Sequence, residues 1–257
     1  LNLQSTTPFT VKGFKISDLH GSVEKKANIT TCSFPSLKIA NGKAQLNFDL
    51  DTNGTEDAVK LNFSLKEANK KLLIKDIIQS KKDGYIDKFS NNKKTIVLKE
   101  DSLSDEGIVS IAIQAEGPMD NILQFEGTGM IHFKEPKIGQ INLFGKISES
   151  LSNLKIPLPS GAFSFNELYI PFELNNESIN FDDLRLTGPL SKMTAEGQFN
   201  LSSGTIDLIA RLSLVGNISV PIVKNLLQFA DPLSKIAEIK ITGNFQQPKW
   251  ELLLSSN

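Results

Sequence analysis

The sequence holds few of the residues on which catalytic and metal sites are most often built. Among 257 residues there are one Cys, two His and one Trp. A single Cys excludes an intramolecular disulfide and a zinc site made of several cysteines. Neither His20 nor His132 has metal-ligand spacing to another His, to Cys32 or to a carboxylate. We expect Cys32 to act as a small buried hydrophobic residue of a strand.

A charge imbalance and long apolar runs are also missing. The 28 Lys and Arg residues against 29 Asp and Glu give a net charge of -1, so the chain as a whole attracts neither nucleic acid nor an anionic membrane. No apolar run reaches the roughly 18 residues of a membrane-spanning helix. The N-terminus, LNLQSTTPFTV, has neither an initiator Met nor a signal-peptide pattern. We therefore expect a piece of a longer or processed chain, with any membrane anchor outside it.

Known catalytic motifs are absent as well. The sequence contains no GxSxG, no HExxH, no Walker-type loop and no dinucleotide fingerprint. The Gly-x-Gly of EGTGMIHF (126–133) lies in a strand-like run, which predicts a bulge or a close backbone approach more than a phosphate site. Asp182 and Asp183 would point to opposite faces of a strand, and no third metal ligand lies nearby. We expect no enzyme, cofactor or metal; a glycosidase would need two facing carboxylates, and no motif points to them.

What the sequence does have is an alternation of apolar and polar residues with a period of two. KAQLNFDL (43–50) and AVKLNFSL (58–65) each place four apolar residues on one face, and Asn53-Gly54 between them is a hairpin signal. Residues 42–65 are therefore expected to form a β-hairpin. The same alternation returns in three later stretches: ELYIPFEL (167–174), TAEGQFNL (194–201) and TIDLIARLSL (205–214). Strands joined by short turns predict an antiparallel meander.

Between the later strands the apolar parity shifts by one residue. Ile179 and Phe181 share one parity, whereas Leu184 and Leu186 share the other. A β-bulge at Asp182-Asp183 would return both pairs to the same face of the sheet.

Three segments have apolar residues at helical spacing: 66–79, 141–154 and 221–237. In the third, Pro221 suits a first turn and Pro232 should end or kink the helix. We expect short amphipathic helices that pack on the sheet or cap it; the alternative is docking on a membrane surface. The lysine-rich stretch 66–106 is expected to be a solvated helix and loop, or to contact anionic lipid head groups.

The expected fold is therefore mainly β: an antiparallel meander forming a curved sheet or groove, with a few short amphipathic helices packing on it or capping it. We divide the chain into two regions. Residues 1–120 form a β-rich part with the charged insertion at 66–106, and residues 121–257 form a C-terminal β region with helices near 141–154 and 221–237.

The C-terminal region has a characteristic order of short motifs. A strand pair ends in LTGP (186–189), a turn and a strand follow from Ala195 to Leu208, and ITGNFQQPKW (241–250) closes the series after a proline-containing helix. Upstream, FEGTGMIHFKEPKIGQINLFGKISESL (125–151) has the pattern of a short strand followed by a helix. In this order the motifs resemble the C-terminal region of AsmA-like envelope proteins, which are related to TamB and the bridge-like lipid-transfer proteins.

The resemblance implies a periplasmic protein tethered to the inner membrane by a segment outside this sequence. In the bridge-like relatives, a long sheet forms a groove along which phospholipid acyl chains can move. We therefore expect a non-enzymatic periplasmic domain that contributes to phospholipid transfer or outer-membrane homeostasis, with phospholipid or another acyl-chain lipid as partner. The alternative is a structural β-domain with a filled core that scaffolds envelope assembly and recruits an envelope protein by strand addition.

The residues expected to line such a groove are apolar members of the alternating strands: Ile170, Phe172, Phe199, Leu201, Ile206, Leu208, Leu212 and Leu214. Alternation leaves two roles open for each of them, core packing and contact with an acyl chain. No nucleic acid partner is expected, because the lysines are not interleaved with aromatic residues. The stretch IKITGNFQQPKW (239–250) predicts a last strand broken near Gly243, with Trp250 packing over an end of the sheet.

Overall fold

The computed structural model describes residues 1–54, 56–83, 107–134, 165–189, 191–214, 237–245 and 247–253. In these residues the chain forms one sheet of 14 strands, one α-helix, α1 (Lys70–Lys82), and a short 3₁₀ helix, η3 (Ile122–Gln124). The strands are β1 (Asn2–Ser5), β2 (Phe9–Val11), β3 (Phe14–Lys26), β4 (Ile29–Ile39), β5 (Gly42–Asp51), β6 (Ala58–Asn69), β7 (Ile108–Pro118), β8 (Glu126–Lys134), β9 (Glu167–Asn175), β10 (Ser178–Thr187), β11 (Ser191–Asn200), β12 (Thr205–Leu214), β13 (Ala237–Asn244) and β14 (Lys249–Leu253).

The sheet is an antiparallel meander in which strands adjacent in the chain are adjacent in space. From β3 to β14 the order in the sheet is the order in the chain, while β1 and β2 both pair with β3. The sheet is curved and open, since it does not close into a barrel. The expected curved antiparallel meander is thus confirmed. The two expected regions share this sheet, because β7 and β8, on either side of residue 120, pair along their length.

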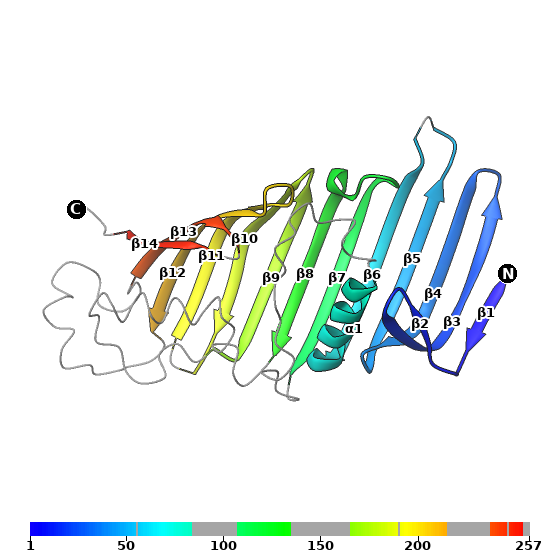
Figure 1. The fold of residues 1–257 in the computed structure, drawn as a ribbon, viewed down its shortest axis with the longest axis horizontal. Helices are drawn as coiled ribbons and strands as arrows, with labels where there is room; N and C mark the ends of the chain where they lie inside the picture. The colour runs from blue at the N-terminus through cyan, green and yellow to red at the C-terminus, as the bar shows by residue number, and fades with distance from the viewer. Residues whose placement is uncertain are drawn as a thin grey trace, which may run out of the picture.

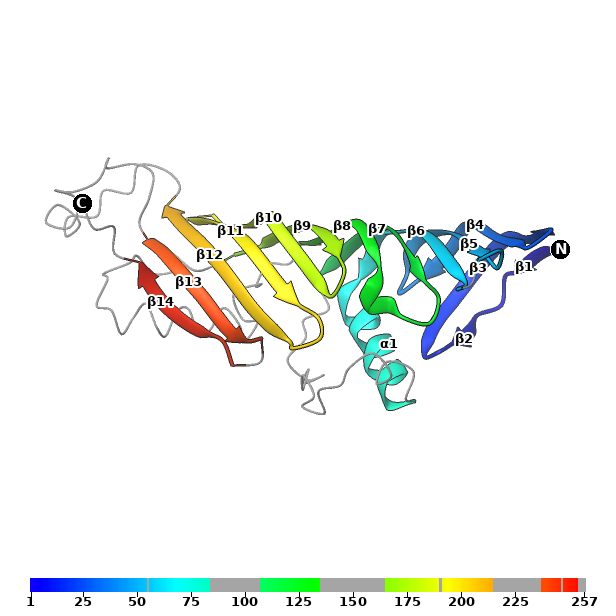
Figure 2. The same ribbon diagram turned by 90° about the horizontal axis from the view of Figure 1, so that it is seen from above.

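The sheet forms a long band whose strands run across its long axis (Figure 1). From above, the band bends so that β13 and β14 at one end and β2 at the other lie on the side on which α1 packs (Figure 2). We call the side that carries α1 the concave face and the opposite side the convex face.

The ends of the strands form two borders of different character. One border, the turn border, holds short turns, and backbone hydrogen bonds connect neighbouring turns. Met119 N–H donates to Asp57 O over 2.8 Å, and Glu177 N–H donates to Leu123 O over 2.6 Å. The opposite border, the α1 border, is where β6 ends at Asn69 and α1 begins. The three longest connections, 70–107, 135–166 and 215–236, all join strands at the α1 border.

Bulges keep the apolar residues on the concave face. In β10, Asp182 and Asp183 together face Glu196, between the pairs Phe181–Gly197 and Leu184–Ala195. The bulge predicted at this position is therefore confirmed. Each bulge adds one residue to one strand, which restores the in-out alternation after a parity shift.

A second bulge lies in β6, between Leu65 and Ala68. There Glu67 has a φ of +54°, in the left-handed region that side chains other than Gly rarely adopt. Its N–H donates to Ser110 Oγ over 3.1 Å, which satisfies the backbone group that leaves the ladder.

Helix α1 begins four residues later than the predicted segment 66–79, because β6 continues to Asn69. The Asn69 side chain caps the helix by accepting a hydrogen bond from Leu72 N–H over 3.0 Å. On the concave face, Leu73 is buried in a cluster with Leu37 and Leu65. The helix predicted at 141–154 lies outside the described residues, as does the one at 221–237 except for Ala237, which begins β13.

The hairpin predicted over 42–65 is present, with β5 and β6 paired from Asp51–Ala58 to Lys43–Lys66. The prediction for the C-terminal stretch is wrong in one respect. β13 ends at Asn244, near the expected break, but the chain then turns and adds β14, which pairs back on β13. Pro248 immediately precedes β14, in the turn, where a proline removes no ladder hydrogen bond.

Candidate functional site

The concave face carries rows of apolar residues that run along the long axis of the sheet. Residues that pair directly across antiparallel strands point to the same face, so the strand register defines each row. One row, the central row, runs from β4 to β9 with no polar member: Phe34, Leu46, Phe63, Ile113, Gly129 and Phe172. All of its residues are half-buried.

A second row, the long row, runs beside it on the turn-border side and reaches from β3 to β13. Its members are also apolar residues, with two glycines: Val23, Cys32, Phe48, Leu61, Ala115, Gly127, Leu174, Ile179, Phe199, Ile206 and Gly243. Neighbouring strands are about 4.8 Å apart, so this row is roughly 48 Å long. The Cys of the chain, Cys32, is a half-buried member of the row and a free thiol.

Burial on the concave face changes along the strands. Close to the α1 border the apolar side chains are buried, with Leu65 and Val109 each 1% exposed. Farther along the same strands, Phe63 and Ile113 of the central row are half-buried. Helix α1 packs with the buried residues of this border. The central row and most of the long row therefore form the accessible part of the apolar face, while Ala115 and Ile206 of the long row are buried. A molecule binding this face would meet the half-buried members.

Glycines in and beside these rows leave room for aromatic rings. A Cβ at Gly129 would overlap the ring of Phe172, its cross-strand partner, and a Cβ at Gly21 would overlap the ring of Phe34. Each ring therefore occupies the space beside a glycine of the neighbouring strand. The close approach expected for the Gly-x-Gly of 126–133 is found here, in β8.

The eight groove candidates lie in or beside β9, β11 and β12; two of them are buried and five are half-buried. Ile206 and Leu212 are 6% and 2% exposed and belong to a buried cluster. Ile170, Phe199 and Leu208 are half-buried and pack on that cluster. Phe172 and Leu201 are also half-buried, Leu201 in the turn after β11, and the backbone of Leu214 pairs with Ser191.

The sequence prediction missed the N-terminal half of the same face. Leu46, Phe48, Leu61 and Phe63 were expected only to form a hairpin, yet they continue the rows that contain Phe172 and Phe199. The alternation in residues 43–65 was the signal that could have identified them. What sequence alone did not supply was the pairing of β6 with β7, which are separated by the stretch 70–107.

The convex face is polar and carries cross-strand ion pairs. Lys60 Nζ lies 3.1 Å from Glu116 Oε2. Arg211 Nη2 lies 2.8 Å from Glu196 Oε1, and this hydrogen bond raises the pKa of Arg211. The two faces therefore differ sharply in chemistry, as expected for a sheet with one apolar and one solvated side.

A polar cluster on the convex face connects β8, β9 and β10. His132 Nε2 lies 2.7 Å from Glu167 Oε1, and the His132 ring meets the Tyr169 ring edge-on at 5.8 Å between centroids. On the other side of Tyr169, the guanidinium of Arg185 lies 4.9 Å from the ring centroid. These contacts connect side chains of three adjacent strands.

Metal-binding groups do not gather in the described part of the chain. No set of three or more His, Cys, Asp or Glu residues there is placed to hold a metal ion. Both carboxylates of the bulge, Asp182 and Asp183, are exposed, and Asp183 Oδ2 pairs with Arg185 Nη2 at 3.0 Å. Within the described residues, no helix has the length and apolar character needed to cross a bilayer.

Two further residues have environments that bear on the site. Half-buried Asp76 of α1 accepts a hydrogen bond from Lys15 N–H over 3.2 Å, and burial raises the pKa of its carboxyl group despite the nearby Lys15 and Lys75.

Trp250 of β14 pairs with Ile241 and packs half-buried against the concave cluster, as expected for a ring that covers an end of the sheet. Its indole Nε1 is buried without a hydrogen-bond partner among the described residues.

Comparisons with known proteins gave no relatives. No family model, no curated protein and no solved structure matches the chain. Functional conclusions therefore depend on the residues and geometry described above.

Proposed function

We propose that this chain is a non-enzymatic periplasmic domain of an AsmA-like envelope protein, tethered to the inner membrane by a segment outside the sequence. In this proposal it contributes to phospholipid transfer or outer-membrane homeostasis by holding acyl chains on its concave face. The single observation that carries the proposal is the long row, an uninterrupted line of apolar residues and glycines from Val23 to Gly243.

The dimensions of the rows suit an acyl chain. The hydrocarbon core of a bilayer is about 30 Å thick, so one extended acyl chain is about 15 Å long. The long row exceeds this length about threefold at the usual strand spacing. A lipid could therefore take several positions along the row, contacting its half-buried members and passing over the buried Ala115 and Ile206, which is what passive movement along a groove requires.

The energetics of such binding are favourable but modest. Each methylene removed from water contributes about 0.8 kcal/mol, so burying about ten of them gives roughly 8 kcal/mol before the costs of ordering the chain. Half-buried side chains such as Phe63 and Phe172 still expose surface that a lipid would cover. The polar head group stays in water, because no charged residue belongs to the rows.

The scaffold alternative has one observation in its favour. Ile206 and Leu212, two of the eight groove candidates, are already buried by protein and would not touch a ligand. A domain with a filled core would recruit a partner through its outer strands, β1 and β14, by strand addition. The half-buried central row favours lipid binding over this alternative, because a filled core would bury Phe34, Phe63 and Phe172 as well.

Native mass spectrometry after gentle purification tests the proposal. We expect the folded chain to carry one or more lipid masses and to bind fluorescent acyl probes. A folded chain that never carries lipid and does not bind the probes would leave the scaffold function as the better account.

A further inference from the structure

Three lysines face one another on adjacent strands at the α1 border. Lys38 of β4 pairs directly with Lys43 of β5, and Lys43 pairs directly with Lys66 of β6. All three are exposed, and the alternation places them on the convex face. Asp18 lies 2.8 Å from Lys38 Nζ, whereas Lys43 and Lys66 have no ion-pair partner in the described part of the chain.

Such a row costs stability in the isolated protein. Like charges directly opposite each other on neighbouring strands repel, while opposite charges attract. Farther along the same strands, Lys60 has Asp49 and Glu116 as its direct cross-strand partners. The sheet thus pairs opposite charges where β5, β6 and β7 meet, but it keeps Lys43 beside Lys66. The repulsion between these two lysines would be relieved by an anionic partner.

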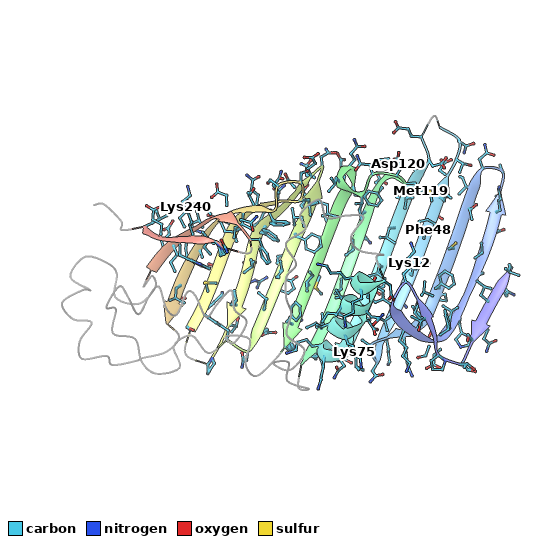
Figure 3. The ribbon with its side chains drawn as sticks, viewed as in Figure 1. Lys12, Phe48, Lys75, Met119, Asp120 and Lys240 are labelled. Carbon is cyan, nitrogen blue, oxygen red and sulfur yellow. The ribbon has the colours of Figure 1, made fainter. Side chains whose placement is uncertain are left out.

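Two aliphatic side chains are also exposed at the α1 border. Leu72, in the first turn of α1, is 37% exposed, and Ile108, which pairs with Asn69 at the start of β7, is 40% exposed. Lys75 of α1 lies at the same border (Figure 3). We call Lys38, Lys43, Lys66, Leu72, Lys75 and Ile108 the border patch.

At the opposite border, several of the described side chains are acidic. Acidic residues in and next to the turns are exposed there: Glu56, Asp57, Asp120, Glu126 and Glu177. Asp120 lies across the sheet from Lys75 in Figure 3. Among the described residues, the border patch and these turns therefore differ in charge, although the net charge of the whole chain is -1. A negatively charged surface would attract the lysines of the border patch and repel the acidic side chains of the turns. This difference would orient the molecule on the surface.

We propose that the border patch docks the protein on the surface of an anionic lipid bilayer, with the strands pointing away from that surface. The lysines would contact the phosphate head groups, and Leu72 and Ile108 would insert among them. Basic residues combined with exposed aliphatic ones are typical of interfacial membrane contacts. Single-stranded nucleic acid fits less well, because its binding sites add aromatic side chains on which bases stack, and the border patch has none.

The docking is separate from the proposed acyl-chain function. It uses residues at the α1 border, whereas the proposed cargo lies on the concave rows nearer the turn border. Vesicle binding and co-purified lipid are measured independently. The experiments therefore distinguish a protein that docks without carrying lipid from one that carries lipid without docking.

The experiment is vesicle flotation with the whole chain. Phosphatidylcholine vesicles with and without phosphatidylglycerol are compared for the wild type, for Lys43→Gln/Lys66→Gln, and for Lys25→Gln/Lys249→Gln. The last variant removes two exposed lysines near the turn border and so has the same net charge. Each lysine near an anionic bilayer contributes a factor of about five in binding. We therefore expect a loss of about 25-fold for the first variant and less than twofold for the control.

Thermal denaturation of each variant shows whether a loss of vesicle binding is caused by a loss of folding. Removing the facing lysines is expected to leave the Tm unchanged or raise it, since it relieves a repulsion. The proposal is overturned if the wild type binds neutral and anionic vesicles equally, or if the two double variants lose binding equally. Tighter binding to DNA than to anionic vesicles, lost in Lys43→Gln/Lys66→Gln, would likewise overturn it in favour of a nucleic acid partner.

Discussion

The ring of Phe172 on β9 lies over Gly129 on β8, its direct cross-strand neighbour, and fills the space that a Cβ at Gly129 would occupy. This contact lies in the central row, between Ile113 and the C-terminal strands. It connects the two halves of the apolar face, because the ring bridges a position that has no side chain. Aromatic rings over strand glycines are a known way to stabilise a sheet at such a gap.

Adding a methyl group at this position should be most unfavourable while the ring is present, because the ring is its nearest neighbour, ahead of the backbone oxygen of Ala112. Gly129→Ala is expected to lower the free energy of unfolding by about 1 to 3 kcal/mol, the usual cost of overpacking. In the background of Phe172→Leu the same substitution should cost less than half as much. Urea denaturation of the four proteins of this cycle gives the coupling. Additive effects would contradict the contact between the ring and Gly129.

Because the bulge in β10 is one extra residue, deleting Asp182 should be tolerated. Removing Asp182 leaves Phe181, Asp183 and Leu184 in strict alternation, so every apolar side chain stays on the concave face. We expect this variant to fold with a stability within about 1 kcal/mol of the wild type, because one extra residue defines the bulge.

Deleting Gln198 from β11 is the matched control. This strand pairs regularly with β12 along its length, so the deletion turns part of it to the wrong face and should abolish cooperative unfolding. Circular dichroism during urea unfolding distinguishes the two variants. Equal damage from both deletions would show that the bulge is not an insertion between regular segments.

Asp76 gives a prediction about pH. Because its pKa is raised in the folded protein, the folded state holds this proton more tightly than the unfolded chain, whose value is about 3.9. Stability contributed by the protonated form is therefore present at low pH and is lost as pH rises through the raised pKa. Asp76→Asn keeps an oxygen acceptor for Lys15 N–H and removes the ionisation.

We expect Asp76→Asn to be more stable than the wild type at pH 7, by less than about 1 kcal/mol because solvent screens a half-buried carboxylate. The difference should disappear near pH 3, where both states of the wild type are protonated. Urea denaturation over this pH range measures it. A variant that is less stable at pH 7 would indicate that attraction to Lys15 and Lys75 outweighs burial.

Trp250 gives a prediction about an unsatisfied donor. Its ring packs on the concave cluster, while its buried Nε1 lacks a partner in the described residues. Trp250→Phe removes that donor and keeps most of the ring, so we expect a stability within about 1 kcal/mol of the wild type. Trp250→Ala should cost roughly 2 kcal/mol, since the ring is only half-buried. If Trp250→Phe lowers the stability as much as Trp250→Ala does, the indole N–H donates a hydrogen bond in the folded protein.

Much of the fold followed from the alternation of apolar residues. The hairpin at 42–65 and the bulge at Asp182-Asp183 both depend on contacts between strands close in the chain. The start of α1 was misplaced because pairing with β7 extends β6 to Asn69, which then caps the helix. That pairing joins residues far apart in the chain, and no local pattern indicates it.

The candidate site was only partly predictable for a related reason. The sequence assigns a residue to a face, but its exposure depends on position along the strand. Phe199 and Leu212 have the same pattern in the sequence, yet Phe199 is half-buried and Leu212 is 2% exposed. The border patch was not predictable as a unit, since Lys38, Lys43 and Lys66 come together only through the register of β4, β5 and β6.

The central claim, that acyl chains bind the concave rows, is tested most directly by placing a photoreactive amino acid at Phe63 and, separately, at the adjacent Asn62. These neighbours point to opposite faces, Phe63 within the central row and Asn62 exposed on the convex face. Phe172 and Glu173 form a second such pair on β9.

After irradiation in cells, mass spectrometry measures the lipid attached at each position. We predict lipid adducts at Phe63 and Phe172 and none above background at Asn62 and Glu173. Adducts at all four positions in equal amount, or at none of them, would contradict the account.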